Sequence, residues 1–179
     1  MKHTAKVLRL TVTLLAICAI VAAALAGVNA LTEPVIAQRN AEKTQAAIEK
    51  VLPGGGTLLE SFPNEKGIIQ AVYASEKGYA IEVTPAGFGG PITMMVGVSG
   101  GRVTAIDIIS HTETPSLGAV AGADNAQGKA FRGQFSGLSG ILKVTRDGGH
   151  IDAITSATIT SRAVTEGVNA ALACAAALG

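Results

Sequence analysis

The pattern of hydrophobic positions begins with an apolar run, because residues 10–31 contain no charged side chain. A helix of that length rises about 33 Å, which is enough to cross a bilayer core of about 30 Å. Lys2, Lys6 and Arg9 precede the run, and the positive-inside rule places such a segment, 1–9, in the cytoplasm. We therefore expect a single transmembrane helix, with every later residue on the outer (periplasmic or extracellular) face.

A cleaved signal peptide is the alternative interpretation of this run. Ala24, Leu25 and Ala26, followed by Gly27, resemble a small-residue cleavage site. The uncharged stretch continues past that site and is longer than a usual signal core, which favours a retained anchor. The remainder of the chain is exported in both interpretations.

A second helical pattern follows the apolar run. Proline disfavours helix at the residue before it, so the anchor helix is predicted to end at Pro34. Residues 35–52 then show helical periodicity, and Pro53–Gly56 should stop this second helix. We assign 32–56 to a juxtamembrane helix and linker, and 57–179 to one domain. The apolar face of the second helix is predicted to comprise Ile36, Ala47, Ile48, Val51 and Leu52.

Alternating apolar and polar positions then predict two β-hairpins, 68–74 with 79–83 and 93–98 with 103–109. Segment 110–128 is expected to be irregular. Three more elements are predicted: a short helix at 129–135, a strand at 141–145 and a final helix at 160–178. The fold class is therefore α+β, with a mainly antiparallel sheet flanked by helices.

Composition excludes several functions. A net charge of +1 and an aromatic content of 3% argue against nucleic-acid binding.

Cys18 lies in the anchor and Cys174 in the domain, so no disulfide is expected. No Cys/His cluster has metal-ligand spacing, and Ser161, His111 and Asp107 lack a nucleophile-elbow pattern. We assign no metal ligand and no catalytic residue; Met94 and Met95 are interpreted as core.

Chemistry is concentrated just before the final helix, at Asp152–Ser161. Small hydroxyl residues at a helix start are commonly N-caps, and Thr158, Thr160 or Ser161 fits that role. A helix start also attracts phosphate, because it carries free N–H groups and the positive end of the helix dipole. Both interpretations are compatible with the residues alone.

Three segments together resemble the FMN-binding domain family. Asp152–Thr158 matches its Asp-x-x-Thr-Gly-Ala-Thr flavinylation motif, with Ser156 in place of glycine. Gly87–Ile92 resembles its Gly-aromatic-x-Gly-Pro-Ile element. His111–Gly118 resembles its His-x-Glu-Thr-Pro-Gly-Leu-Gly loop, with Ser116 at the position of the first glycine of that loop. With its single anchor and short length, the chain most resembles the G subunit of Rnf-type ion-translocating electron-transport complexes.

The resemblance implies a cofactor and its partners. A flavin transferase would move FMN from FAD onto the Thr158 hydroxyl as a phosphoester, beside the small Ser156 and Ala157. The other residues implied to border the flavin are Glu113, Thr114, Leu117 and Gly118. The chain would then carry electrons among other membrane subunits of an Rnf-type complex, without turnover of its own. The alternative is an anchored flavin- or ligand-binding or sensory module outside any pump, with no covalent flavin.

Overall fold

The computed structural model of the chain describes residues 2–64 and 66–179, with no side chain described at positions 2–5, 8 and 37. Met1, the first residue of the expected cytoplasmic segment 1–9, therefore lies outside the described residues. The chain divides into two compact units, the first ending at Glu42 and the second spanning Lys43–Gly179. The domain expected at 57–179 falls within the second unit.

The N-terminal helix α1 (Lys2–Val51) continues through Pro34, so the prediction that the anchor helix ends there is wrong. Proline removes one backbone donor, but the neighbouring hydrogen bonds of a helix can persist around it. In the preceding turn, the Thr32 hydroxyl donates to the carbonyls of Val28 and Asn29 at 2.9 and 3.3 Å. This hydroxyl adds hydrogen bonds to the turn next to the missing donor.

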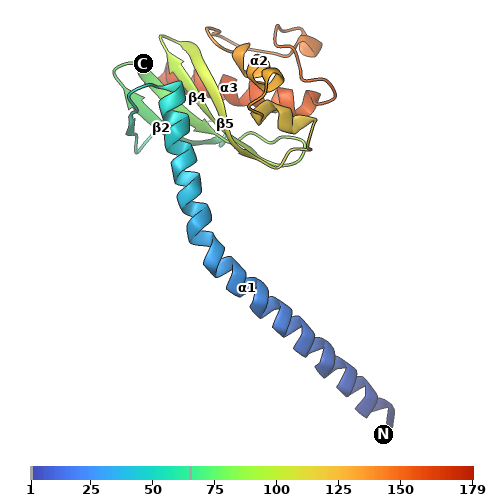
Figure 1. Cartoon of the computed structure of the whole chain (residues 1–179). Coiled ribbons are helices and arrows are strands. Elements are labelled where there is room, and N and C mark those ends of the chain that lie inside the picture. Colours follow the sequence, from blue (N-terminus) through green and yellow to red (C-terminus); the bar gives the residue numbers. More distant parts are fainter. Residues whose placement is uncertain (1, 65) are drawn as a thin grey trace. The chain divides into compact units, whose positions relative to one another are not determined.

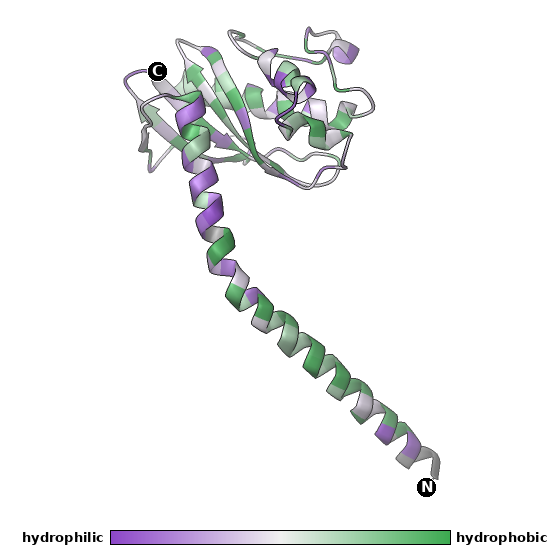
Figure 2. Ribbon diagram, viewed as in Figure 1, coloured by the Kyte–Doolittle hydropathy of each residue, from purple (hydrophilic) through white to green (hydrophobic). Residues whose placement is uncertain are grey.

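An apolar stretch of α1 has the dimensions of a membrane span. Arg9–Val51 contains an 18-residue window with a mean hydropathy of 2.5, long and apolar enough to cross a membrane. Its large apolar side chains are exposed, for example Leu15 at 68% and Leu31 at 78%. Figure 2 shows apolar residues following one another along the N-terminal part of α1, where the anchor was expected at 10–31, and hydrophilic residues closer to the C-terminal end of the helix.

The second unit contains a five-stranded antiparallel sheet in the order β1-β2-β3-β4-β5 (Figure 1). Each strand pairs with its neighbour in sequence, which confirms both predicted hairpins. The short edge strand β1 was not predicted. The strands are β1 (Thr57–Leu58), β2 (Ile69–Ser75), β3 (Gly78–Val83), β4 (Ile92–Ser99) and β5 (Arg102–His111).

Two hydrophobic clusters lie on opposite faces of this sheet. Met94 belongs to the larger cluster with helix α3 (Thr158–Leu178), while Met95 belongs to a smaller cluster with the end of α1. Both methionines are fully buried, as predicted. The α1 residues of the smaller cluster are Ala47, Ile48, Val51 and Leu52. Ile36, which was predicted to share their face, is instead 54% exposed and lies in the first unit.

The connections differ from the prediction at three places. Helix α2 (Ala126–Gly133) begins earlier than expected, because the Asn125 side chain caps it by accepting from Gly128 N at 2.8 Å. A 3-10 helix, η1 (Gly118–Gly122), lies inside the segment expected to be irregular. The strand expected at 141–145 is absent from this described segment.

Only one isolated bridge, between Val144 and Ile151, forms in place of that strand. Ile141 is 87% exposed, and Gly140 before it has a φ of +76°, so the run begins at a turn and its first side chain is not buried. A 3-10 turn, η2 (Thr145–Asp147), follows directly. Cys18 and Cys174 are both free, and burial raises the pKa of the Cys174 thiol.

Candidate functional site

A cavity of about 600 Å³ opens at the start of α3. Its size is ordinary for a cofactor pocket. Four segments line it, namely the loop before β4, the loop after β5, the η2 turn and the connection into the start of α3. All seven residues proposed from the sequence to contact a cofactor lie in its wall: Glu113, Thr114, Leu117, Gly118, Ser156, Ala157 and Thr158.

Thr158 is the first residue of α3, which begins earlier than the predicted Thr160. The N-cap position is Ala157, and no side chain caps the helix, so the capping interpretation is wrong. The hydroxyl groups of Thr160 and Ser161 donate elsewhere, to Glu113 and to the Ala157 carbonyl. The free N–H groups of the first helical turn therefore remain beside a half-buried Thr158.

The connection that presents Thr158 is fixed by side-chain hydrogen bonds at two points. The Gln134 amide clamps the backbone of Asp152, accepting from its N–H at 2.7 Å and donating to its carbonyl at 3.1 Å. Ser161 Oγ accepts from Ile154 N at 3.0 Å. The backbone before α3 is thus held in place without any ligand.

Glu113 is buried, with only 6% of its surface exposed, and connects two walls of the cavity. Its Oε1 accepts from the backbone N–H groups of Phe88 and Gly89, at 2.7 and 3.3 Å. Its Oε2 accepts from the Thr160 hydroxyl at 3.0 Å. Both carboxylate oxygens therefore accept from protein donors, and Glu113 joins the loop before β4 to the start of α3.

Two glycines of the quoted motifs leave room for this carboxylate. A Cβ atom added at Gly87 would overlap Glu113 Oε1, and one added at Gly118 would overlap Glu113 Oε2. The Gly118 position is further closed by the Thr160 hydroxyl, 2.6 Å from such a Cβ. A side chain at either glycine would therefore displace the Glu113 carboxylate from its present position.

Two serines adopt the left-handed backbone conformation that favours glycine. Ser116 and Ser156 both have a φ of +62°, and among the described residues they are the only non-glycine positions with a positive φ. They are also the two positions at which this chain departs from the glycines of the quoted motifs. The local backbone thus keeps the glycine-type conformation despite the substitutions.

Sequence reasoning missed several pocket residues. Phe88 and Ile159 line the cavity with large apolar side chains that are 68% and 50% exposed, beside Leu117 at 40%. Phe88 belongs to a quoted motif, which was the available signal. No sequence pattern marked Arg146, which also lines the cavity. The other missed lining residues are Ala153, Ile154, Thr155 and Thr160.

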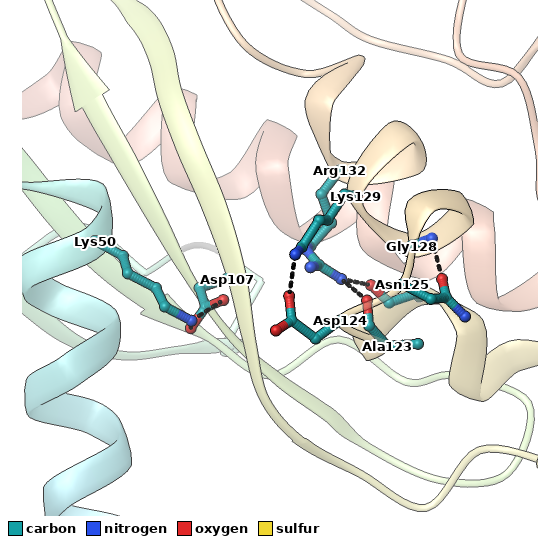
Figure 3. A network of polar contacts seen from close by, with 9 residues as sticks. Lys50, Asp107, Ala123, Asp124, Asn125, Gly128, Lys129 and Arg132 are labelled. Carbon is teal, nitrogen blue, oxygen red and sulfur yellow. Dashed lines mark hydrogen bonds and ion pairs between the residues drawn. The ribbon is translucent and has the colours of Figure 1, made fainter.

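Polar contacts join α2 to the residues just before it, which follow the loop after β5 (Figure 3). Arg132 Nη1 donates to the Ala121 carbonyl at 2.6 Å, and Lys129 pairs with Asp124 at 3.0 Å. The hydrogen bond from Lys129 lowers the pKa of Asp124. These contacts fix the segment containing η1, whose first residue, Gly118, lines the cavity.

Other chemical interpretations gain no support from the geometry. Asp107 forms an ion pair with Lys50 at 3.1 Å (Figure 3), while Ser161 Oγ is bonded to backbone groups. His111 Nδ1 accepts from the backbone N–H of Glu113 at 3.3 Å. In the part of the chain that the structure describes, no group of three His, Cys, Asp or Glu side chains is arranged to hold a metal ion.

Known proteins resemble the part of the chain that forms this cavity. The family model described as FMN-binding domain matches residues 87–173, which include every residue that lines the cavity. The chain is 34% identical to the G subunit of the proton-translocating ferredoxin:NAD(+) oxidoreductase complex of Clostridium ljungdahlii, over 96% of this chain and 92% of that protein. It is 33% identical to the G subunit of the Na(+)-translocating ferredoxin:NAD(+) oxidoreductase complex of Acetobacterium woodii, over 91% and 88%. The G subunit of the ion-translocating oxidoreductase complex of Methanosarcina acetivorans is 28% identical, over 96% of both chains.

Proposed function

This chain belongs to the family of G subunits of ion-translocating oxidoreductase complexes and has its FMN-binding domain, and on that premise we propose that it is an electron-transfer subunit carrying covalent FMN. The observation that carries the proposal is the position of Thr158. Thr158 lines the cavity beside uncapped N–H groups, and its hydroxyl makes no hydrogen bond to a described residue.

The residues of the cavity suit the two ends of FMN. Hydroxyl and backbone N–H groups at the start of α3 suit a phosphate, while Phe88, Leu117 and Ile159 offer apolar surface to a flavin ring. Bound FMN would supply the electron-transfer chemistry. Glu113 would hold the walls of the cavity in fixed positions relative to one another, because it already joins the loop that contains Phe88 to α3.

Attachment would be a phosphoryl-group transfer from FAD, catalysed by a flavin transferase. A bond forms between Thr158 Oγ and the phosphorus of the FMN half, and the pyrophosphate P–O bond of FAD breaks. The hydroxyl proton is released and AMP leaves. A permanent link keeps the cofactor at high local concentration, which suits an exported domain that cannot easily replace lost FMN.

The membrane arrangement is part of the proposal. The apolar stretch of α1 would anchor the chain, with 1–9 in the cytoplasm and the FMN-binding domain, assigned to 57–179, on the outer face. The expected partners are the other membrane subunits of an Rnf-type complex, because the relatives named above are subunits of such assemblies. Co-purification with those subunits would distinguish a pump component from a lone sensory module.

The direct test is expression of the full chain together with a flavin transferase. In-gel flavin fluorescence should survive denaturing electrophoresis in the wild type and disappear in Thr158→Val, while Thr158→Ser should retain some because a hydroxyl remains. Thr57→Val is the matched control, since Thr57 is an exposed threonine outside the quoted motif and outside the cavity wall, and it should keep wild-type fluorescence. A dark wild-type band, or an FMN-sized mass on the Thr158→Val protein, would refute the assignment.

A further inference from the structure

Of the described residues that line the cavity with Thr158, Arg146 is the one with a cationic side chain. The other charged residue in the cavity wall is Glu113, whose carboxylate oxygens are already occupied by donors from the protein. Within the described residues, Arg146 takes part in no salt bridge and no side-chain hydrogen bond. Its guanidinium is therefore available to an anion in the cavity.

The acidic neighbour of Arg146 does not neutralise it. Asp147 is held by Arg162, which donates from Nε at 2.7 Å and from Nη2 at 2.5 Å. The hydrogen bond from Arg162 lowers the pKa of Asp147, so this pair carries no net charge at neutral pH. The positive charge of Arg146 consequently remains uncompensated by its neighbour.

The same ion pair connects Arg146 to the helix that bears Thr158. Arg162 lies four positions after Thr158, one turn further along α3, and its partner Asp147 directly follows Arg146. The η2 turn is therefore tied to the first two turns of α3. The guanidinium of Arg146 and the Thr158 hydroxyl belong to two segments that this ion pair joins.

We infer that Arg146 is a positioning residue that binds the phosphate of FMN linked to Thr158. The inference rests on the proposed function, since it requires a phosphodiester at that hydroxyl. Such a diester carries a full negative charge, whereas the helix start offers only partial positive charge. A guanidinium supplies several N–H donors in a plane that matches two phosphate oxygens, so Arg146 would complete the anion site.

The test compares flavinylated wild-type chain with Arg146→Gln and Arg146→Lys by phosphorus-31 NMR, in detergent at low salt. The phosphodiester resonance should move in Arg146→Gln and stay closer to the wild-type position in Arg146→Lys, which keeps the charge. Raised salt should move the wild-type resonance toward that of Arg146→Gln, because screening weakens an exposed pair. Lys143→Gln is the matched control: it removes one positive charge from the same segment, outside the cavity wall, and should leave the resonance unchanged.

A second measurement separates ligand binding from folding. In a Thr158→Val background, which carries no phosphate, Arg146→Gln should leave the thermal midpoint unchanged, because Arg146 is exposed. In the flavinylated protein, the same change should reduce the rise in Tm that accompanies flavin attachment. An unshifted resonance in Arg146→Gln, or an equal shift in Lys143→Gln, overturns the inference. A denatured wild-type protein without any phosphodiester resonance refutes the proposed function itself.

Discussion

Glu113 and Thr160 share a buried hydrogen bond of 3.0 Å that joins the loop after β5 to the first turn of α3. The same carboxylate accepts from Phe88 N, so one side chain connects three segments of the cavity wall. A charged acceptor with several donors suits this position because each donor offsets part of the cost of burying the charge. The contact also explains why Thr160, one of the hydroxyl residues near the helix start, does not cap α3.

Removing the Glu113 carboxylate should destabilise the domain. Buried hydrogen bonds to charged groups each contribute about 1.5–3 kcal/mol, so Glu113→Ala is expected to lower the free energy of unfolding by at least about 2 kcal/mol. Glu113→Gln keeps the shape and can still accept from Phe88 N, so its cost should be smaller. Circular dichroism of the full chain in detergent, followed with urea, measures both. Equal stability of the alanine variant and the wild type would rule out this bracing role.

Replacing the two left-handed serines by glycine should stabilise the protein. Ser116 and Ser156 both have a φ of +62°, a conformation that costs a residue with a side chain roughly 1 kcal/mol. Glycine avoids this cost but loses more entropy on folding, so Ser116→Gly and Ser156→Gly should each add about 0.5 kcal/mol. The thermal midpoint of each variant measures the gain.

Ser139→Gly is the control for these changes. Ser139 is exposed in a loop and does not have a positive φ, so glycine there should slightly destabilise the chain through the unfolded state. If all three glycine variants change the thermal midpoint in the same direction, backbone conformation is not the cause.

Gln134 should control how readily Thr158 is modified. Its side chain clamps the Asp152 backbone through two hydrogen bonds, so Gln134→Ala should loosen the connection into α3 and slow flavin attachment. Hydrogen exchange of amides 152–157 should also become faster. Gln127→Ala is the control, because Gln127 is an exposed residue of α2. Wild-type exchange and attachment rates in Gln134→Ala would contradict the prediction.

The half-buried Glu82 should make stability depend on pH. Burial raises the pKa of Glu82, and burial together with the Glu82 carboxylate raises the pKa of Tyr73. Because the folded pKa of Glu82 lies above the unfolded one, its contribution is fully present below the ordinary glutamate pKa and is lost as pH rises through the raised value. Glu82→Gln has no such loss, so its Tm relative to wild type should increase between about pH 4 and pH 7. The exposed Glu60→Gln is the control, and parallel Tm curves for Glu82→Gln and wild type would contradict the expectation.

Local patterns predicted the regular elements well. Both hairpins follow from alternation and from turns such as Gly100-Gly101, which are properties of neighbouring residues. The pattern of apolar residues gave a wrong strand at 141–145, where an apolar residue is exposed and not buried. Ile141 begins a strand-like run, yet it is 87% exposed, and the run begins at a turn at Gly140.

The candidate site was predictable only in part. Quoted motifs named seven residues that line one cavity, but their contacts depend on residues distant in sequence. Glu113 and Thr160 are separated by 47 positions, and no local pattern pairs them. Gln134 and Arg146 were missed for the same reason, since each acts on a segment that only the tertiary fold brings near.

The helix that presents Thr158 is also a major part of the hydrophobic core. Val164 and Val168 of α3 are completely buried in the large cluster, together with strands β2 to β5. A chain in which α3 has not yet docked therefore has the recognition motif but neither the cavity nor a formed helix start. Under the proposed function, flavin attachment should for this reason report on completed folding, and a nascent or damaged domain would be left unlabelled.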